Sequence, residues 1–319
     1  MYYLGVDVGG TNICAGVIDE KFNILKKNSC KTNIFQTMEK VCDDIEDLCI
    51  KTLTDIGLKT SDISYVGIGV PGSVNTEKGI VEYLPNLFFN NWPLVKMMEE
   101  RLKIKVLIEN DANAAAFGEY IINQNKNINC AIMITIGTGI GSGIILDGKI
   151  YSGSNYNGAE LGHMVICMDG RKCACGRCGC FESYASASGL ILTTKEMLKA
   201  NTDKTVIWEM ISENINNVTA KTAFDAMRLG DELGKKIVNM YTNHLSCGLV
   251  NVVNIFQPDI IYIGGGVSNE GEMLLNPVRK YIERERYSKH AKKQTQIAIA
   301  TLGNDAGVIG AALIDSAKN

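Results

Sequence analysis

The stretch from residue 158 to residue 182 constrains this chain more than any other. It reads GAELGHMVICMDGRKCACGRCGCFE, so His163 precedes four cysteines, Cys173, Cys175, Cys178 and Cys180, which lie among glycines and charged residues. Neither a helical nor a strand periodicity can be drawn through the cysteines. A tetrahedral zinc ion needs four nitrogen or thiolate donors on short, turning backbone, and one histidine with three of these thiolates supplies them. The stretch therefore predicts a metal site.

The alternative to a metal site is a pair of disulfides, but nothing in the sequence indicates export, and a reducing cytosol keeps thiols free. The spacing leaves open which of Cys175, Cys178 and Cys180 is spare, because C-x-x-C is also a usable pair of ligands. Four protein donors leave no open coordination position, so the zinc is expected to be structural. The stretch also holds two carboxylates that the metal does not require, Glu160 and Glu182. They suggest a polar pocket beside the metal.

Length and composition set the broad class. A chain of 319 residues is long for one core and favours two domains. With 46% hydrophobic and 21% charged residues it is expected to be globular, and a net charge of -3 with both signs mixed along the chain excludes an electrostatic footprint for nucleic acid or an anionic membrane. The start, MYYLGVDVGG, has no basic region or cleavage site, and no apolar run reaches about 18 residues. We expect a cytoplasmic protein.

The N-terminal residues 2–19 predict a hairpin of two apolar strands. Its turn consists of Gly9, Gly10, Thr11 and Asn12. Backbone N–H groups and a hydroxyl in such a turn can cradle phosphate oxygens, and Asp7 just before it could hold the Mg²⁺ that accompanies a nucleotide. An ordinary hairpin turn is an equally good interpretation of this feature taken alone.

A partial internal repeat favours the phosphate interpretation. Residues 133–148, MITIGTGIGSGIILDG, again predict strand, glycine turn and strand, with a turn at Gly137, Thr138 and Gly139. Two similar α/β halves that each offer one glycine turn to a shared cleft make a nucleotide clamp. This organisation resembles the actin, hexokinase and Hsp70 class of ATPases.

The sequence ENDANAAAFGE at residues 109–119 predicts a strand that ends at Asn110 and Asp111 and a helix that begins at once. A carboxylate at such a strand tip can act as the general base in phosphoryl transfer to an alcohol. Asn and Asp are also common helix N-caps, so a purely structural role is the competing interpretation.

Periodicity and turn residues predict the remaining elements. Helices are expected over 38–56, 94–102, 186–199, 208–215, 222–227, 231–256 and 305–317, and strands over 65–72, 105–108, 259–266 and 297–302. Residues 82–94 are expected to form an irregular loop. The strand over 259–266 ends in three glycines, Gly264, Gly265 and Gly266, where the backbone allows a flat ring to approach. A simple strand-to-helix turn is the alternative there.

Several motifs together carry a family resemblance. DVGGTN, ENDANAA, TIGTGIGSG, GAELGH and CACGRCGCFE resemble the ROK family of bacterial sugar kinases and sugar-responsive repressors, and in particular its glucokinase-like members. The resemblance covers essentially the whole chain. Its most specific part is C-x-C-G-x-x-G-C-x-E, which is matched by Cys173, Cys175, Gly176, Gly179, Cys180 and Glu182.

The resemblance implies roles for individual residues. Structural Zn²⁺ would be bound by His163, Cys173, Cys175 and Cys180, with Cys178 as a variable position. Sugar hydroxyls would be bound by Asn110, Asp111, Glu160, His163 and Glu182. Asp111 would also be the catalytic base, and His163 would use one ring nitrogen for zinc and the other for the sugar. Adenosine would lie near Gly264, Gly265 and Gly266.

The expected fold is α/β, a two-domain actin-like ATPase (ribonuclease H-like/hexokinase-type) fold with an interdomain cleft. The domains would be residues 1–111 with 305–319, and residues 112–304. The expected activity is the transfer of a phosphoryl group from ATP with Mg²⁺ to a hexose. The resemblance to glucokinases implies glucose as the hexose, with its 6-hydroxyl as the acceptor. N-acetylmannosamine kinase and fructokinase activities are the alternatives within the family.

A different class of function is a sugar-responsive repressor. Such repressors carry a helix-turn-helix domain ahead of the first hairpin, where this chain has only Met1, so a sugar-sensing regulator is the weaker expectation. A non-sugar ATPase of the same fold does not explain GAELGH together with the cysteine motif. The resemblance further implies a homodimer or homotetramer.

Overall fold

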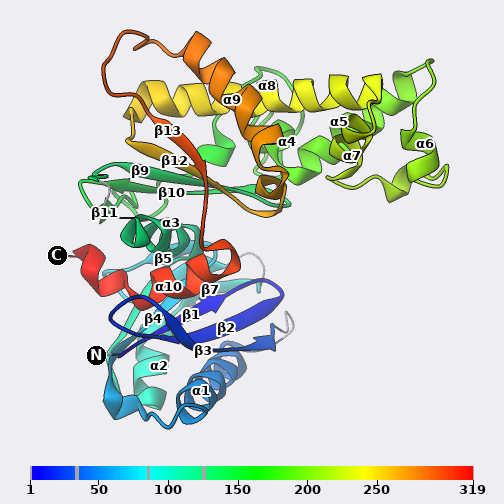
Figure 1. Ribbon diagram of the computed structural model, residues 1–319. Coiled ribbons are helices and arrows are strands. Elements are labelled where there is room, and N and C mark those ends of the chain that lie inside the picture. Colours follow the sequence, from blue (N-terminus) through cyan, green and yellow to red (C-terminus); the bar gives the residue numbers. More distant parts are fainter. Residues whose placement is uncertain (1, 33–35, 85–86, 124–126, 319) are drawn as a thin grey trace. The chain divides into compact units, whose positions relative to one another are not determined.

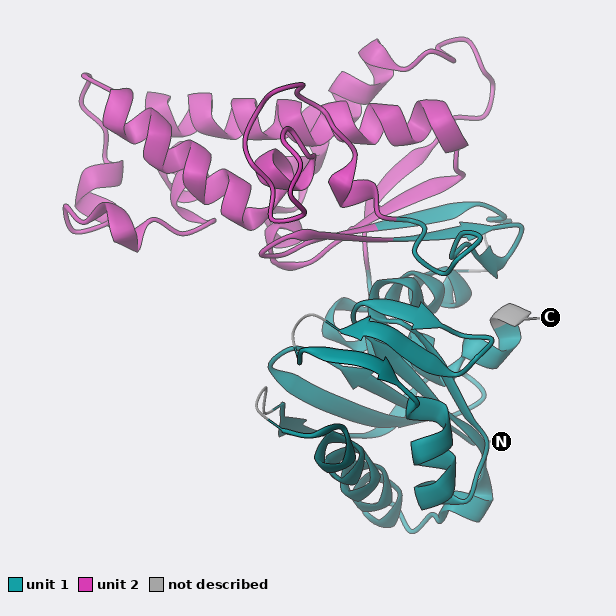
Figure 2. Ribbon diagram, turned by 180° about the vertical axis from the view of Figure 1, so that it is seen from behind, with its two compact units in different colours: residues 1–133, 143–159, 301–319 teal, residues 134–142, 160–300 magenta. Residues whose placement is uncertain are grey.

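The computed structural model describes residues 2–32, 36–84, 87–123 and 127–318 (Figure 1). The chain divides into two compact units. Unit 1 comprises residues 1–133, 143–159 and 301–319, and unit 2 comprises residues 134–142 and 160–300 (Figure 2). The C-terminal segment thus belongs to the same unit as the N-terminus. The domain boundaries predicted from the sequence, 1–111 with 305–319 and 112–304, stay a prediction.

The central sheet of unit 1 has the strand order β3-β2-β1-β4-β8. Its strands are β1 (Tyr2–Val8), β2 (Asn12–Ile18), β3 (Ile24–Lys31), β4 (Ile63–Val70) and β8 (Val106–Asn110). The first three strands form an antiparallel meander, as predicted for the first hairpin, and β4 and β8 run parallel to β1. The carboxyl ends of β1, β4 and β8 therefore lie at one edge of the sheet, where ligands bind in open α/β sheets.

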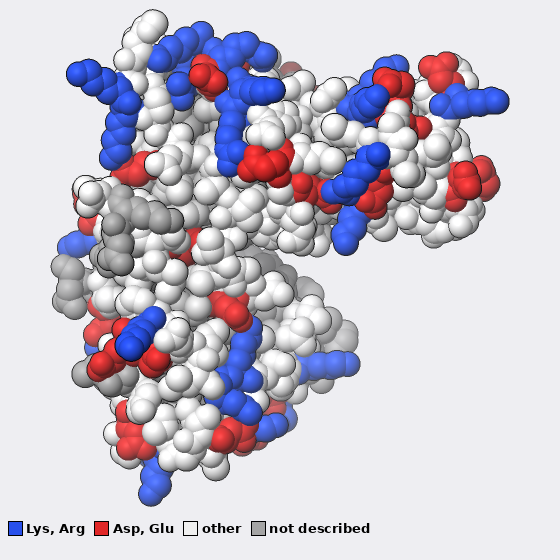
Figure 3. All heavy atoms as spheres, viewed as in Figure 1, with Lys and Arg blue, Asp and Glu red and all other residues white. Residues whose placement is uncertain are grey.

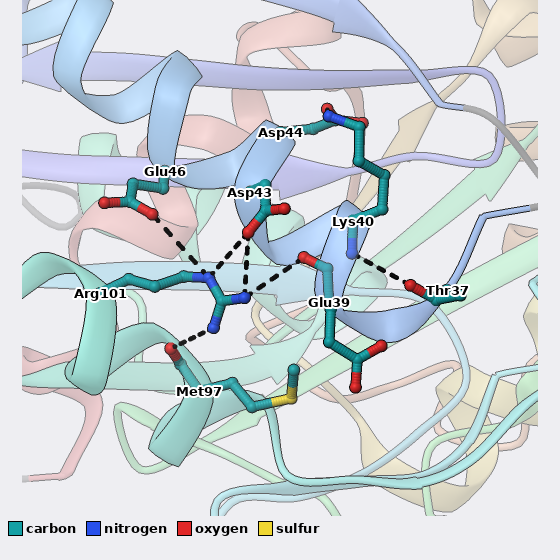
Figure 4. A network of polar contacts seen from close by, with 8 residues as sticks. All are labelled: Thr37, Glu39, Lys40, Asp43, Asp44, Glu46, Met97 and Arg101. Carbon is teal, nitrogen blue, oxygen red and sulfur yellow. Dashed lines mark hydrogen bonds and ion pairs between the residues drawn. The ribbon is translucent and has the colours of Figure 1, made fainter.

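Two helices, α1 (Met38–Thr54) and α2 (Leu94–Leu102), pack against each other in unit 1. Helix α1 begins where the Thr37 side chain accepts a hydrogen bond from the Lys40 N–H. Arg101 of α2 joins the helices: its Nη2 lies 3.0 Å from Asp43 Oδ1, and its Nη1 donates to the Met97 carbonyl at 3.1 Å (Figure 4). The Arg101 guanidinium therefore helps to hold α1 and α2 together.

Helices α3 (Asp111–Ile122) and α10 (Ala306–Ala312) pack together in unit 1, and α10 lies directly on the sheet. Glycines in the strands, which have no side chain, permit this close approach of α10 to the sheet. A Cβ at Gly5 would lie 2.0 Å from the Val308 carbonyl oxygen, and one at Gly67 would lie 1.8 Å from that of Ala311. The small residues of the predicted C-terminal helix therefore build the core next to the carboxyl edge of β1.

A second, three-stranded antiparallel sheet lies in unit 1, with the order β5-β6-β7. It comprises β5 (Ser73–Asn75), β6 (Ile80–Leu84) and β7 (Phe89–Trp92). The expectation of an irregular loop over residues 82–94 was wrong for this region, apart from residues 85–86, which lie outside the described residues. Fully buried Trp92 pairs with Val81, so burial of the indole outweighs the turn preference of the neighbouring asparagines.

The other five-stranded sheet has the order β11-β10-β9-β12-β13. Its strands are β9 (Ala131–Ile136), β10 (Ile140–Leu146), β11 (Lys149–Ile150), β12 (Ile260–Gly264) and β13 (Gln296–Ile299). The two sheets are equivalent: in each, the first strand is central, the next two extend on one side of it, and the last two extend on the other. This equivalence confirms the internal repeat that the two glycine hairpins predicted.

The helices of unit 2 are α4 (Glu182–Ala185), α5 (Ala187–Ala200), α6 (Ile207–Met210), α7 (Thr222–Arg228), α8 (Glu232–Phe256) and α9 (Glu272–Glu285). The long helix α8, yellow in Figure 1, and helices α5 and α7 agree with the predicted positions. The helix predicted over 208–215 was wrong beyond Met210, because Ser212 and Glu213 adopt left-handed φ angles of 52° and 55°. Helix α9 was not predicted.

Short 3-10 helices complete the described chain. They are η1 (Thr60–Asp62), η3 (Leu161–His163), η4 (Ile215–Asn217), η5 (Gly266–Glu270), η6 (Gly303–Asp305) and η7 (Ile314–Lys318). No helix among the described residues is both long and apolar enough to cross a membrane. Lys and Arg side chains and Asp and Glu side chains all lie over the face drawn in Figure 3, and neither sign covers it.

Candidate active site and metal centre

Four side chains of unit 2 gather their donor atoms as a metal ion requires. His163, Cys173, Cys175 and Cys180 each offer one atom, and these atoms lie within 4.8 Å of one another. Nδ1 of His163 is 3.7 Å from Sγ of Cys173, and the Sγ atoms of Cys175 and Cys180 are 3.6 Å apart. A tetrahedral zinc ion with ordinary bond lengths separates its ligand atoms by roughly 3.6–3.8 Å. The donor set therefore fits zinc in number, type and spacing.

The loop that carries these donors is held by tight turns and two isolated bridges. Val165 bridges to Cys180, and Lys172 bridges to Cys178. Gly179 has a φ of 82°, and a Cβ there would lie 1.7 Å from the Cys167 carbonyl oxygen, so only glycine fits. Cys178 is exposed and is not one of the four clustered donors. The four clustered residues are those that the family resemblance implied as zinc ligands, and their binding of zinc, with Cys178 spare, stays a prediction.

Glu182 lies beside this cluster, at the start of α4. Its Oε1 is 3.7 Å from Cys173 Sγ, and its Oε2 accepts a hydrogen bond of 2.8 Å from the backbone N–H of Ile140. Glu160 is exposed and directly precedes η3, which ends at half-buried His163. Three of the five predicted sugar-binding residues therefore belong to the metal loop and its flanks in unit 2.

The two glycine turns close their hairpins as predicted. In the first turn the Gly9 N–H donates to the Asn12 carbonyl at 2.9 Å, and Gly10, Thr11 and Asn12 are exposed. In the second turn the Gly137 N–H donates to the Gly139 carbonyl at 3.0 Å, and Gly137 and Thr138 are exposed. Exposed backbone in both turns is compatible with phosphate binding, which stays a prediction.

Two carboxylates occupy the carboxyl edge of the parallel strands in unit 1. Asp7 belongs to the end of β1, and Asp111 directly follows β8. Burial raises the pKa of Asp7 to about 6; the charge of Asp111 contributes to this increase, and Lys27 opposes it. Burial also raises the pKa of Asp111, against the hydrogen bond of 2.9 Å that it accepts from the Ala112 N–H. The paired charges make this edge a site for a cation or for a proton.

Asn110 performs the helix-capping role that competed with the catalytic interpretation of the motif at residues 109–119. Its Oδ1 accepts hydrogen bonds from the N–H groups of Ala112 and Asn113, at 3.0 and 3.1 Å, and caps α3. Its amide also donates to the Gly72 carbonyl at 3.1 Å, which ties the ends of β4 and β8 together. Asn110 thereby fixes the position of Asp111, whereas its own contact with a sugar stays a prediction.

The three glycines after β12 have different surroundings. Gly264 is the last residue of β12, and Gly265 has a φ of 82° and would place a Cβ 2.4 Å from the Ile136 carbonyl oxygen. A Cβ on Gly266 would meet no atom within 4 Å. Close packing on β9 explains Gly265, and η5 begins at Gly266, so the strand-to-helix turn is present. The adenosine site predicted there stays a prediction.

Sequence reasoning missed Gly307, which lies against Asp7. A Cβ on Gly307 would lie 2.6 Å from Asp7 Oδ2, so this glycine of α10 leaves room for the carboxylate. Near it, Lys27 of β3 donates to Asp305 Oδ1 at 2.5 Å. The small-residue pattern AGVIGAA was visible in the sequence, but no local signal connects Gly307 with Asp7, which lies 300 positions earlier.

Comparison with known proteins agrees with this geometry. The ROK family matches residues 3–318. The glucokinase of Streptomyces coelicolor is 34% identical over 310 residues, which cover 97% of this chain and 96% of the relative. The crystal structure of a ROK family glucokinase from Streptomyces griseus, in complex with glucose and AMPPNP, has a TM-score of 0.80 and 34% identity, and the match covers 100% of this chain and 99% of that one.

The ROK hexokinase of Thermus thermophilus has a TM-score of 0.79 at 28% identity, with 98% of this chain and 97% of that chain covered. These likenesses extend over both five-stranded sheets, and the fold is the two-domain actin-like ATPase fold that the repeated hairpins predicted. The cysteine motif and the full-length match lead to one conclusion. The chain belongs to the ROK family.

Proposed function

We propose that the protein is an ATP-dependent sugar kinase that phosphorylates glucose to glucose 6-phosphate. The observation that carries this proposal is the position of Asp111, a half-buried carboxylate at the carboxyl edge of the parallel strands. The resemblance in sequence to a glucokinase over nearly the whole of both chains supports the choice of reaction. The glucose and AMPPNP in the related crystal structure support the choice of substrates.

In the proposed mechanism Asp111 takes the proton from the sugar hydroxyl as that oxygen attacks the γ-phosphorus of ATP. The bond from the γ-phosphorus to the β,γ-bridging oxygen breaks, and ADP leaves with that oxygen. Phosphoryl transfer requires little covalent chemistry from the protein. Positioning of the substrates and stabilisation of the charge on the phosphates therefore supply most of the rate acceleration. Burial raises the pKa of Asp111, which makes its carboxylate a better proton acceptor. The hydrogen bond of 2.9 Å from the Ala112 N–H and the N-terminus of α3 act in the opposite direction and favour the ionised carboxylate.

We assign nucleotide binding to the two glycine turns and to the glycines after β12. The residues are Asp7, Gly9, Gly10, Thr11, Asn12, Gly137, Thr138, Gly139, Gly264, Gly265 and Gly266. Asp7 would hold Mg²⁺, which neutralises developing charge on the phosphates. The half-buried Asp7 carboxylate has the oxygen donors that Mg²⁺ prefers.

We assign structural zinc to His163, Cys173, Cys175 and Cys180, which use all four coordination positions of a tetrahedral ion. Because Nδ1 of His163 faces Cys173, this nitrogen would bind the metal and leave Nε2 for the sugar. Asn110, Asp111, Glu160, His163 and Glu182 would bind the sugar hydroxyls. In this arrangement the metal fixes the direction of a substrate-binding imidazole.

The test is ATP-dependent phosphorylation of glucose, mannose, fructose, N-acetylglucosamine and N-acetylmannosamine by purified, zinc-replete protein. We expect kcat/KM to be highest for glucose. A preference for N-acetylmannosamine or fructose would keep the mechanism and replace the substrate. Sugar binding by calorimetry without turnover of any sugar would refute the kinase proposal and favour a sugar sensor.

A further inference from the structure

The Glu182 carboxylate touches both the metal cluster and the second glycine turn. One oxygen, Oε2, accepts the Ile140 N–H at 2.8 Å, immediately after the turn 137–139. The other, Oε1, lies 3.7 Å from Sγ of Cys173, a metal donor. A Cβ on Gly139 would lie 2.3 Å from Oε2, so the bare backbone at residue 139 makes room for the carboxylate. All of these residues belong to unit 2.

A second connection joins the same turn to the metal cluster through η3. Gly162 lies against the Ile140 carbonyl, because a Cβ there would be 2.5 Å from that oxygen. The Leu161 N–H donates to Ser142 Oγ at 3.0 Å, and the next residues lead directly to His163. The start of β10 is therefore held from one side by the segment that carries His163 and from the other by Glu182, two residues after Cys180.

We propose that Glu182 is a positioning residue that couples metal binding to nucleotide binding at the turn 137–139. The inference rests on the proposed function in taking this turn as a phosphate site. A metal ion bound to His163 and Cys180 fixes the two segments that hold the start of β10, and Glu182 fixes the Ile140 N–H. The exposed backbone of the turn is then preorganised for phosphate. In other metal proteins, residues that contact the metal's ligands hold those ligands in position in the same way.

Linkage makes this coupling reciprocal: if metal strengthens nucleotide binding, bound nucleotide strengthens metal binding by the same factor. The experiment measures the zinc dissociation constant by equilibrium competition with a chromogenic chelator, with and without saturating AMPPNP and Mg²⁺, and without sugar. We expect AMPPNP to lower the zinc dissociation constant of the wild-type protein at least about fivefold. In Glu182→Ala, the zinc dissociation constant is expected to be higher and independent of AMPPNP. Equal zinc dissociation constants with and without bound AMPPNP in the wild-type protein would overturn the coupling.

Two glycines of the turn offer a matched pair of variants that leaves every metal donor and Glu182 intact. Gly139→Ala places a methyl group against Oε2 and displaces the carboxylate, whereas Gly137→Ala meets no atom within 4 Å. Without nucleotide, we expect Gly139→Ala to bind zinc at least about fivefold more weakly than the wild-type protein and Gly137→Ala to match the wild-type protein. Indistinguishable zinc dissociation constants in two folded variants, verified by circular dichroism, would show that Glu182 does not link the turn to the metal.

The outcomes separate this inference from the proposed function. If calorimetry detects no binding of AMPPNP with Mg²⁺ to the wild-type protein, the kinase proposal fails, and the glycine pair still decides whether the turn and the metal are linked. If AMPPNP binds without strengthening zinc binding, the kinase proposal stands and the coupling fails.

Discussion

Asp111 carries the largest share of the proposed chemistry at the scale of single residues. Asp111→Asn keeps the size of the side chain and an acceptor for the Ala112 N–H, but it removes the base. We expect kcat for glucose phosphorylation to fall about 10²–10⁴-fold, the usual contribution of a general base. Glucose binding, measured by calorimetry, should change little. A kcat within tenfold of the wild-type value would remove Asp111 from the mechanism.

Asp7 gives a prediction for stability, because burial raises its pKa from 3.8 to about 6 in the folded protein. A raised pKa favours the protonated form, so the stabilisation is complete below pH 3.8 and is lost as the pH rises through about 6. At pH 8 the charge of half-buried Asp7 therefore destabilises the protein. Two pKa units correspond to about 3 kcal/mol as an upper value. Asp7→Asn should raise the free energy of unfolding at pH 8 by up to that amount.

The measurement is urea unfolding without Mg²⁺ or nucleotide. The chain has two tryptophans, and Trp92 lies fully buried in unit 1 with Asp7, whereas Trp208 lies in unit 2. In a Trp208→Phe background the fluorescence therefore reports on unit 1. The gain from Asp7→Asn should shrink between pH 7 and pH 4.5. A gain of equal size at both values would mean that ionisation of Asp7 is not its cause.

At the scale of elements, the metal loop can be tested with two neighbouring exposed cysteines. Cys175 belongs to the donor cluster and Cys178 does not. We expect Cys175→Ser to lose most of its zinc and its sugar affinity, because a serine hydroxyl is a poor replacement for a thiolate. Cys178→Ser should retain one zinc per chain. Atomic absorption of both purified variants checks this, and equal zinc contents would refute the assigned ligand set.

The same scale separates what the sequence can predict from what it cannot. The metal donors lie within 18 residues of one another, so their chemistry is visible in a short window. The contact between Glu182 and Ile140 joins residues 42 positions apart, and no local pattern signals it. Helix α9 contains Pro277, which masks an otherwise amphipathic pattern. Strand β3, ILKKNSCK, is largely polar and is held by its pairing with β2 rather than by apolar alternation.

At the scale of the whole molecule, the first unit is assembled from segments that are far apart in the chain. Residues 301–319 belong to unit 1, and α10 fills the space over Gly5 and Gly67. The Tyr65 hydroxyl donates to the Ala312 carbonyl at 2.5 Å, which adds a buried polar contact between the segments. The glycine positions could be read from the sequence, whereas the helix that requires them could be placed only by the fold.

Unit 1 should therefore fail to fold in a chain that ends at Ala300. Without α10 the sheet face that carries Gly5 and Gly67 loses the helix that lies on it, and the chain loses the burial of Val308 and Ile309, each of which contributes roughly 1.5–3 kcal/mol. In the Trp208→Phe background, the truncated chain should show the red-shifted Trp92 emission of an unfolded unit. A chain that ends at Asp315 retains α10 and Ile314 and serves as the control, with native emission. Native emission from the shorter chain as well would mean that the N-terminal segments reach their structure without the C-terminal helix.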